Sequence, residues 1–280
     1  MWNKFENRSY LGSRTKGVIK TNTEHLPLVS VVTVVYNAEK YLEKTILSII
    51  GQSYDNIELI IVDGNSNDRT KEIILKYENF IDYAISEIDF GIYDAMNKAI
   101  DFCNGELVNF MNAGDQFYSI NVVDSIVNEI SKNFDIYYGD ISVEYNGYRR
   151  VQVAGDPDKL WKGMVFSHQS TFTRLKYLKK FKFEKKYKIV ADMNFFIRAY
   201  IQGLAFKRSN LIVASVLSGG LSDSNRLQTV FSSFIVAKSH FSSPKIIIYY
   251  TLSLLDTLLR IVIKKILKPS IVNKIIQLKK

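Results

Sequence analysis

The chain has 280 residues, 47% hydrophobic and 23% charged, which is ordinary for a folded protein and enough for one large domain or two small ones. Its one cysteine, Cys103, excludes an internal disulfide framework and fits a reducing compartment. The N-terminal sequence "MWNKFENRSYLGSRTKG" has charge but no apolar stretch of the kind found in signal peptides. We therefore expect the N-terminus to stay in the cytoplasm.

The net charge of +9 is concentrated in two segments. Residues 174–188 contain eight Lys and Arg with one Glu, and residues 260–280 contain seven Lys and Arg with no acid, so each segment carries +7. The remainder therefore carries −5, which is unlike a nucleic-acid groove, and zinc-ligand spacings and RNA-binding aromatic motifs are missing as well. Two basic, apolar-rich segments favour an anionic membrane surface or phosphates as partners. For residues 174–188 the alternative is a solvated lysine surface.

The first half of the chain alternates strand-like and helix-like segments. We expect strands at 28–36, 57–64, 82–87 and 106–114, separated by helices at 38–52, 66–80 and 91–105. Ser66 and Asp68 are typical N-caps for the second helix, and Gly105 is typical of a helix end. The first two strands are continuous apolar runs, as expected for strands that are buried on both faces. This alternation predicts right-handed βαβ units and a parallel sheet.

Polar residues follow three of these strands. Tyr36 and Asn37 end the first strand, Asp63 ends the second, and Asn112 and Asp115 follow the fourth. Because ligands bind beyond the carboxyl ends of the strands in open parallel sheets, we expect these residues to share one edge. A tight turn is the alternative for the last segment, since Asn, Gly and Asp favour backbone reversals. The convergence of three polar strand ends favours a site.

After about residue 120 the pattern loosens. Residues 135–147 and 149–155 predict a β-hairpin, residues 191–203 a helix that ends at a glycine, and residues 206–222 a strand with a Gly-Gly loop. Internal repeats and long Pro/Gly/Ser linkers are missing from the sequence. We therefore predict an α/β fold with a mixed, mostly parallel sheet flanked by helices, formed by one domain at 1–240 and followed by an extension at 241–280.

The extension predicts a basic amphipathic helix. From Ile246 to Lys268 the polar residues recur every three or four positions and form one stripe, opposite Ile, Leu, Val and Tyr; they are Ser253, Asp256, Thr257, Arg260, Lys264 and Lys268. The longest uncharged run, residues 246–255, is short of the roughly 20 residues needed to span a bilayer. We therefore expect the helix to lie in the membrane interface. Packing against the domain or in a dimer is the alternative, and the oligomeric state is open.

Several separated motifs together resemble the family 2 glycosyltransferases, which have the GT-A fold. The matching segments lie in order between about residues 28 and 203: "VSVVTVVYNAEKYLEKTILSIIGQSYDNIELIIVDGNSNDRT", "DFGIYDAMNKAIDFCNGELVNFMNAGDQF", "SHQSTF" and "ADMNFFIRAY". The sequence looks most similar to bacterial members that build capsules, exopolysaccharides or lipopolysaccharide O-chains.

This resemblance implies an inverting, metal-dependent glycosyltransferase. It would move a hexosyl or N-acetylhexosaminyl group from a nucleotide-sugar, above all a UDP-sugar, to a lipid-linked or oligosaccharide acceptor at the inner face of the cell membrane. A non-catalytic nucleotide- or glycan-binding subunit on the same fold is the alternative. A basic nucleic-acid binder is a third hypothesis, which the charge distribution argues against.

The resemblance places the nucleotide at the ends of the first two strands. It implies that Asp63 binds the nucleobase, usually uracil, and a carboxylate there can accept the ring N–H of the base. By the same resemblance Tyr36 and Asn37 belong to this pocket, and Asp94 lies near the nucleoside. From the residues alone, Asp63 could equally be a turn residue beside Gly64, and Asp94 a surface acid within a helix.

The resemblance also implies that Asp115 binds Mn²⁺ or Mg²⁺, because it matches the last acid of the family's metal motif. These cations prefer oxygen ligands and take few from the protein when the donor's phosphates supply others. The small neighbours Ala113 and Gly114 let a diphosphate approach the backbone. Gly114 stands where the commoner pattern has an Asp that helps to hold the ribose, so we expect weaker nucleotide affinity or weaker metal dependence.

Asp192 matches the family's general base, the carboxylate that deprotonates the acceptor hydroxyl during inverting transfer. Ala191 replaces the usual Glu before it, and a helix N-cap is the alternative role for Asp192. His168 and Gln169 resemble a contact to the acceptor or the diphosphate, although a single histidine can also be a buried structural group. Residues 218–222 resemble a flexible loop that closes over the donor.

Overall fold

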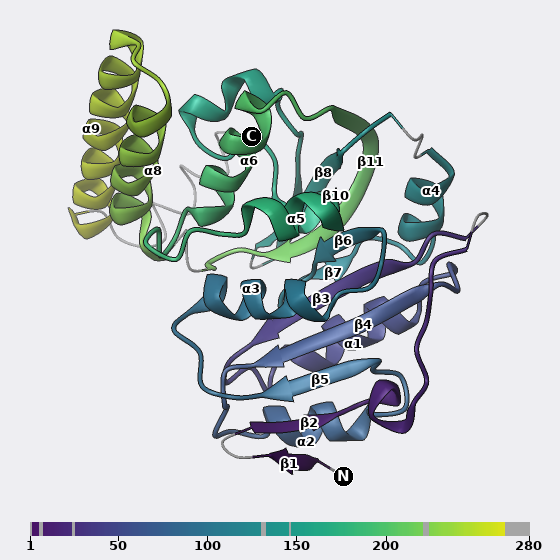
Figure 1. Ribbon diagram of the computed structural model, residues 1–280. Helices are drawn as coiled ribbons and strands as arrows, with labels where there is room; N and C mark the ends of the chain where they lie inside the picture. The colour runs from purple at the N-terminus through teal and green to yellow at the C-terminus, as the bar shows by residue number, and fades with distance from the viewer. Residues whose placement is uncertain are drawn as a thin grey trace.

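The computed structural model describes residues 2–5, 8–23, 26–129, 133–145, 147–220 and 224–266. Within them, one mixed sheet of eleven strands forms the centre of the molecule, flanked by helices (Figure 1). The strands are β1 (Asn3–Phe5), β2 (Arg8–Leu11), β3 (Val29–Val35), β4 (Ile57–Asp63), β5 (Tyr83–Ser86), β6 (Leu107–Phe110), β7 (Gln116–Phe117), β8 (Ile136–Tyr145), β9 (Tyr148–Gln152), β10 (Thr171–Arg174) and β11 (Phe206–Leu217). The α-helices are α1 (Leu42–Ile50), α2 (Thr70–Lys76), α3 (Ile92–Phe102), α4 (Val122–Glu129), α5 (Leu175–Phe181), α6 (Ala191–Ile201), α8 (Arg226–His240) and α9 (Pro244–Ile266), and the 3₁₀ helices are η1 (Ser13–Lys16), η2 (Pro157–Lys162) and η3 (His168–Ser170).

The sheet confirms the predicted fold class. Its strand order is β1-β2-β5-β4-β3-β6-β10-β8-β11-β7, with β9 paired to β8. The four strands β5, β4, β3 and β6 are parallel neighbours, so their carboxyl ends share one edge. The predicted hairpin is present as the antiparallel pair β8 and β9, in which Tyr145 lies opposite Tyr148.

The two central strands are buried on both faces, which explains their continuous apolar sequences. All seven residues of β3 and all seven of β4 are buried. Because successive side chains of a strand point to opposite faces, Val31 packs in the same cluster as Leu42 of α1, whereas Val32 packs with Met96 and Ile100 of α3. Each such burial contributes about 1.5–3 kcal/mol, and together they fix the strand ends on which the site is built.

The start of α2 differs from the prediction. The helix begins at Thr70, with Arg69 as its N-cap residue. The Asp68 carboxylate accepts the Thr70 N–H at 3.0 Å from one position before the cap. The Ser66 hydroxyl donates instead to Asp63 at the end of β4. The prediction that Ser66 caps this helix is therefore wrong, and Asp68 supports the first turn without being its N-cap.

Two glycines that were predicted to end helices have different roles. α3 already ends at Phe102, and Gly105 is required by a close approach, because a Cβ there would lie 2.6 Å from Ser30 N and 2.7 Å from Leu28 O. Gly203 follows the end of α6 with a φ of 73°, the left-handed region that favours glycine. The predicted glycine stop of α6 is therefore confirmed, whereas that of α3 is wrong.

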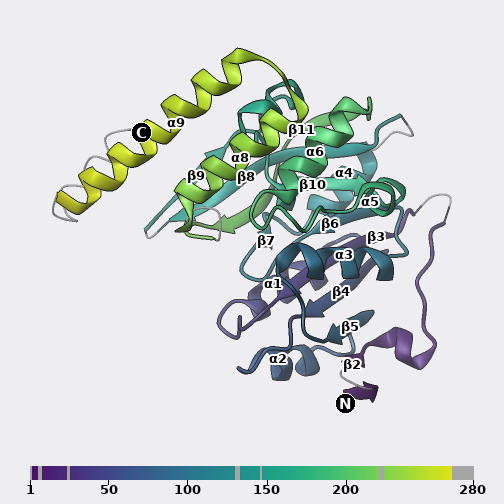
Figure 2. The same ribbon diagram turned by 60° about the vertical axis from the view of Figure 1, so that its left-hand side comes forward.

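The last two helices form a hairpin that stands beside the sheet (Figures 1 and 2). Ile246 and Tyr250 of α9 are buried, and the Tyr250 ring lies 5.6 Å from that of Phe234 in α8. The arrowheads of β4 and β5 point toward the side of the molecule on which this hairpin stands (left in Figure 1). The boundary predicted between residues 240 and 241 falls in the connection of the hairpin, and the division into two domains stays a prediction.

The hairpin is joined to the sheet domain through α6. His240, the last residue of α8, lies with Nε2 2.8 Å from Asn194 Oδ1, so the ring donates to the amide oxygen. Burial lowers the pKa of His240; Glu184 opposes this effect, and Arg198 and Lys186 reinforce it. The contact between α8 and α6 therefore favours the neutral imidazole.

The length of α9 corrects one argument from the sequence. Pro244–Ile263 is a helical stretch of 20 residues with a hydropathy of 1.8, long and apolar enough to cross a membrane by length and composition. Two of its three charged residues, Asp256 and Arg260, form an ion pair of 2.6 Å. Length therefore does not exclude a spanning helix. The side chains of the predicted polar stripe at 264–268, and residues 267–280, lie outside the described part of the chain.

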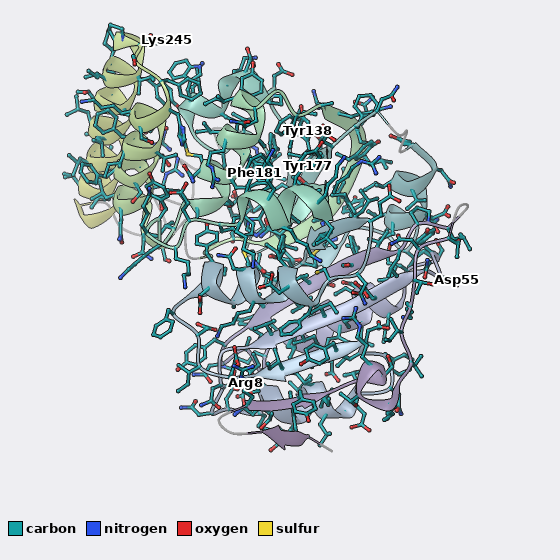
Figure 3. The ribbon with its side chains drawn as sticks, viewed as in Figure 1. Arg8, Asp55, Tyr138, Tyr177, Phe181 and Lys245 are labelled. Carbon is teal, nitrogen blue, oxygen red and sulfur yellow. The ribbon has the colours of Figure 1, made fainter. Side chains whose placement is uncertain are left out.

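The basic segment 174–188 forms part of β10, α5 and the loop before α6. Half of its eight cations have acidic partners: Arg174 with Glu106, Lys182 with Asp101, Lys185 with Asp94, and Lys186 with Glu184. Tyr177 and Phe181 stack on one side of α5, with ring centroids 6.4 Å apart (Figure 3). This segment is thus a partly compensated surface, and its affinity for an anionic partner stays a prediction.

Candidate active site

Asp192 lies at the start of α6 and is surrounded by hydrogen-bond donors. It is 7% exposed. Oδ1 accepts the Met193 N–H and faces the Tyr93 hydroxyl, both at 2.9 Å, and Oδ2 lies 3.0 Å from His168 Nδ1. The N-cap residue of α6 is Val190, without a side-chain cap, so the alternative role of Asp192 as an N-cap is wrong. These donors fix the orientation of the carboxylate at the N-terminus of the helix.

The contacts of His168 determine which of its nitrogens carries the proton. Its Nε2 lies 3.1 Å from Asn112 Nδ2, and an amide nitrogen can only donate. His168 Nε2 is therefore the acceptor, and the proton resides on Nδ1, from which it is donated to Asp192. Since both ring nitrogens are engaged, His168 orients the carboxylate, and Asp192 is the residue that can take a proton from a substrate.

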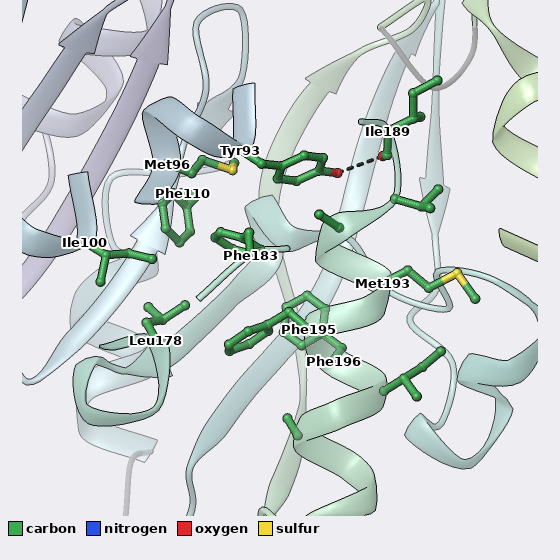
Figure 4. Close-up of a cluster of buried hydrophobic side chains, with 14 of the residues drawn as sticks. Tyr93, Met96, Ile100, Phe110, Leu178, Phe183, Ile189, Met193, Phe195 and Phe196 are labelled. Carbon is green, nitrogen blue, oxygen red and sulfur yellow. Dashed lines mark hydrogen bonds between the residues drawn. The ribbon is translucent and has the colours of Figure 1, made fainter. Parts of the chain in front are cut away.

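Tyr93 of α3 is a buried hydroxyl that faces two acceptors. Its oxygen lies 2.7 Å from the Ile189 carbonyl (Figure 4) and 2.9 Å from Asp192 Oδ1. Burial, with the charge of Asp192 as a second cause, raises the pKa of Tyr93 well above 10, so the group stays a hydroxyl with one proton. The ring is held by Phe183, at a centroid distance of 5.6 Å. Tyr93 was not predicted from the sequence, because its position within a helix carries no signal for this contact.

Asp115 follows β6 in a turn that is built on Thr45. The Thr45 hydroxyl donates to the Asp115 carbonyl at 2.7 Å and accepts the Gly114 N–H at 2.9 Å. Gly114 has a φ of 107°, a backbone conformation that excludes the Asp of the commoner motif unless the turn changes. The Asp115 side chain is 8% exposed and accepts from Gln169 Nε2 at 2.8 Å. Burial raises the pKa of Asp115 to about 6, against the opposing effect of Gln169.

The oxygens near Asp115 fit a divalent cation that completes its ligands from a substrate. Asn112 Oδ1 is buried and has no hydrogen-bond partner among the described residues, so it and the Asp115 carboxylate are available as oxygen donors. The same part of the chain has no group of three His, Cys, Asp or Glu residues that could hold a metal alone. Mg²⁺ and Mn²⁺ bind well with one or two protein oxygens and substrate phosphates.

A cavity of about 410 Å³ opens at the carboxyl ends of β3, β4 and β5. Its lining residues are Tyr36, Gly64, Asn65, Ile88, Asp89 and Gly91. The Tyr36 side chain is 63% exposed and presents an aromatic face. A cavity of this size suits a small organic ligand. Asp89 follows β5 at the same edge of the sheet, and its place after a third strand was the sequence signal that could have identified it.

Asp63 does not line this cavity, and its predicted role needs correction. It is fully buried. Its carboxylate accepts the N–H and the hydroxyl of Ser66 and, at 2.6 Å, the hydroxyl of Ser86. With these donors around it, the carboxylate holds the loop after β4 in place and offers no oxygen to a nucleobase. This is the alternative role considered above, that of a turn residue beside Gly64.

Asn37 and Asp94 support the edges of the cavity. Asn37 Oδ1 accepts the Asn67 N–H at 2.9 Å, which ties the ends of β3 and β4 together. Asp94 is 7% exposed; it accepts the Phe90 N–H at 3.1 Å and pairs with Lys185 at 2.9 Å. Although burial opposes it, the bond from Lys185 lowers the pKa of Asp94. A direct contact from either residue to a nucleoside stays a prediction.

The fold and this site together define a glycosyltransferase of the GT-A class. The profile described as "Glycosyl transferase family 2" matches residues 30–204, and the chain belongs to that family. Among curated relatives, a PGL/p-HBAD biosynthesis glycosyltransferase of Mycobacterium tuberculosis is 28% identical over 205 residues, covering 70% of this chain and 80% of the relative. The teichuronic acid biosynthesis glycosyltransferase TuaG of Bacillus subtilis, whose function is described as putative, is 39% identical over 98 residues, covering 34% of this chain and 39% of TuaG.

Two solved structures share the fold. Residues 1–349 of Staphylococcus aureus TarS in complex with UDP-GlcNAc superpose with a TM-score of 0.61 at 18% identity, over 75% of this chain and 65% of that one. The mannosyltransferase PcManGT of Pyrobaculum calidifontis, in complex with GDP-Man and Mn²⁺, superposes with a TM-score of 0.62 at 14% identity, over 85% of this chain and 71% of that one. At these identities the likeness shows the fold alone.

Proposed function

We propose that this protein is an inverting glycosyltransferase that transfers a hexosyl or N-acetylhexosaminyl group from a UDP-sugar to a hydroxyl of a lipid-linked or oligosaccharide acceptor. The observation that carries the proposal is Asp192, a carboxylate held by donors on both oxygens beside Asp115 and its partner Gln169. Both acids that catalysis needs are present, which argues against a non-catalytic subunit. The similarity to biosynthetic glycosyltransferases of two bacteria supports synthesis of a bacterial surface glycan.

The geometry suggests how the residues divide the work. Asp192 Oδ1 already faces two donors, whereas Oδ2 faces one, so Oδ2 has the lone pair that takes the acceptor's proton. As that proton leaves, the acceptor oxygen bonds to the anomeric carbon, and the bond from that carbon to the diphosphate breaks with its electron pair on UDP. His168 keeps the carboxylate in place throughout. A Mn²⁺ or Mg²⁺ ion held by Asp115 and Asn112 would stabilise the charge that develops on the diphosphate.

We also propose that the hairpin of α8 and α9 rests on an anionic membrane surface at the cytoplasmic face. The outward side of the hairpin is apolar, and its large side chains are between 38% and 61% exposed: Phe231, Ile235, Ile247, Ile248, Leu252, Leu255, Leu258, Leu259, Val262 and Ile263. Such a face suits the headgroup and acyl boundary of a bilayer. Lys245 (Figure 3), whose Nζ lies 4.8 Å from the centre of the Trp161 ring, supplies positive charge toward anionic lipids, whereas Arg260 is paired with Asp256.

The first test is calorimetric titration of the full-length protein with UDP and GDP, each with and without Mn²⁺. UDP binding that strengthens with Mn²⁺ supports the donor class and the role of Asp115. Hydrolysis of a panel of UDP-sugars then identifies the sugar. Failure to bind either nucleotide would refute the proposal, because a family 2 enzyme without nucleotide affinity has no donor.

A further inference from the structure

The carboxylate of Asp89 occupies the space that a side chain at residue 64 would fill. A Cβ built on Gly64 would lie 2.4 Å from Asp89 Oδ2 and 3.3 Å from Tyr36 Cδ2. Gly64 does not have a positive φ, so its backbone conformation does not by itself require glycine. Glycine is needed here because a side chain would collide with Asp89. An acid from the loop after β5 thus takes a place at the end of β4, and the Tyr36 ring borders the same space.

The orientation of this carboxylate is fixed by its own loop. Asp89 Oδ1 accepts the Gly91 N–H at 2.8 Å, and Gly91 has a φ of 111°, which only glycine adopts readily. The neighbouring Phe90 N–H is held by Asp94 at 3.1 Å. These contacts leave Oδ2 as the free oxygen, because no donor in the described ranges contacts it. It lies at the wall of the 410 Å³ cavity.

We propose that Asp89 reads the nucleobase of the donor, with Oδ2 accepting the ring N–H of a uracil that stacks on Tyr36. This inference rests on the proposed function and adds the residue that sets its nucleotide preference. Asp63 cannot take this part, because Ser66 and Ser86 already engage its buried carboxylate. The Tyr36 ring, 63% exposed at the cavity wall, provides the apolar face that a flat base requires.

The single free oxygen explains why uracil fits best. Uracil presents one ring N–H between two carbonyl groups, which matches one carboxylate oxygen. Guanine presents two adjacent N–H donors, which pair best with both oxygens of a carboxylate, and here Oδ1 is already turned toward the Gly91 N–H. Cytosine and adenine present a ring nitrogen lone pair where uracil has its N–H, and a carboxylate repels that lone pair, so only their exocyclic amino group can donate to it. The expected preference is therefore UDP over GDP, and both over CDP and ADP.

The test compares nucleotide preference in wild type and in Asp89→Asn. The substituted amide retains an oxygen to accept the Gly91 N–H, so the loop keeps its contact, but it places an N–H₂ donor where Oδ2 was. We expect UDP affinity to fall about 10- to 100-fold, the usual effect of losing a hydrogen bond to a charged group. CDP affinity should fall less or rise, so the UDP-to-CDP preference should fall by about 10-fold or more. Isothermal titration with Mn²⁺ present measures both.

Two further variants make the result specific. Gly64→Ala places a methyl group against Asp89 Oδ2, so it should lower the UDP-to-CDP preference without any change at residue 89. Glu72→Gln removes an equal charge from an exposed ion pair of α2 and should leave the preference unchanged. Thermal melting confirms that each variant is folded.

The outcomes separate this inference from the proposed function. If wild type binds UDP and Asp89→Asn keeps the same UDP-to-CDP preference, the inference is wrong and the proposed function stands. An equal loss of UDP and CDP affinity would likewise contradict it, because Asp89 would then only support the loop. If wild type binds no nucleotide, the proposed function itself fails.

Discussion

Tyr93→Phe removes the hydroxyl that faces Asp192, the proposed general base, and we expect it to slow transfer without weakening nucleotide binding. The lost hydroxyl lies 2.9 Å from Asp192 Oδ1 and 2.7 Å from the Ile189 carbonyl. It can donate to one of them at a time, since it has one proton. Asp192 keeps its bonds from Met193 and His168, so the carboxylate stays in place but is held less firmly.

The size of the effect follows from what each acceptor loses. Leaving a buried acceptor without its donor costs about 1–3 kcal/mol. Because the hydroxyl has one proton, its removal takes a donor from only one of the two acceptors at any moment. The free energy of unfolding should therefore fall by about 1–3 kcal/mol. A carboxylate that loses one of its three donors is misaligned for part of the time. We expect kcat to fall by about 10-fold, equivalent to about 1.4 kcal/mol in the activation barrier. The Kd for UDP should stay within about 2-fold, a shift below 0.5 kcal/mol, because Tyr93 does not line the cavity proposed for the nucleotide.

Tyr77→Phe is the matched control for this experiment. Its hydroxyl also binds a carboxylate, that of Glu43 at 2.8 Å, but between α1 and α2. Urea unfolding, UDP titration and initial rates with the active donor are measured for both variants. Unchanged kcat in Tyr93→Phe, or a loss of UDP affinity equal to the loss of rate, would refute the role of Tyr93 in positioning Asp192.

Four other predictions concern the base, the metal, the membrane and the pH dependence. Asp192→Asn should keep UDP affinity and lower kcat by about 10²- to 10⁴-fold, the usual contribution of a general base; loss of UDP binding would show that the residue is misplaced. Asp115→Ala should abolish the effect of Mn²⁺ on UDP titration, and an undiminished Mn²⁺ effect would contradict the metal assignment. The double variant Leu252→Gln and Leu259→Gln changes two exposed residues of α9. It should no longer sediment with phosphatidylglycerol vesicles, while its hydrolysis of the donor in solution should continue. Sedimentation equal to that of wild type would disprove the docking surface. Because burial lowers the pKa of His240, the neutral His240 stabilises the fold above about pH 6.5, and this contribution is lost as the pH falls below that value. In urea unfolding, His240→Gln should therefore lose less stability than wild type between about pH 7 and pH 5. An equal loss in both proteins would argue against this role of His240.

The parallel nucleus could be predicted because its sequence signals are local. β3 and β4 need apolar residues on both faces, and this requirement appears directly as unbroken apolar runs. Helix ends were harder, because the residues that resemble caps serve other contacts. Ser66 bonds to Asp63 and Gly105 fits beneath Ser30, and neither contact has a sequence signal separate from that of a cap or a stop.

The site was predicted in position but only partly in chemistry. The strand-end rule placed Tyr36, Asp63 and Asp115 at one edge, as the parallel strands require. It could not tell an acid that faces the cavity from one that is buried by its neighbours. Ser86, which engages Asp63, lies on another strand, and Asp89 reaches the cavity because Gly64 has no side chain. Both contacts depend on which strands are neighbours in the sheet, and a single sequence does not reveal the strand order.

The short helix η3 has a consequence for anyone who wishes to change what this enzyme makes. Its consecutive residues His168 and Gln169 contact Asp192 and Asp115 respectively, so a backbone shift that moves one contact moves the other. Redesign at η3 would therefore disturb both halves of the reaction at once. Among the described residues, neither the loop at 88–91 nor α9 takes part in the hydrogen bonds of His168 and Gln169. If the proposals above are right, donor choice and membrane attachment could therefore be altered at these two places without a change at η3.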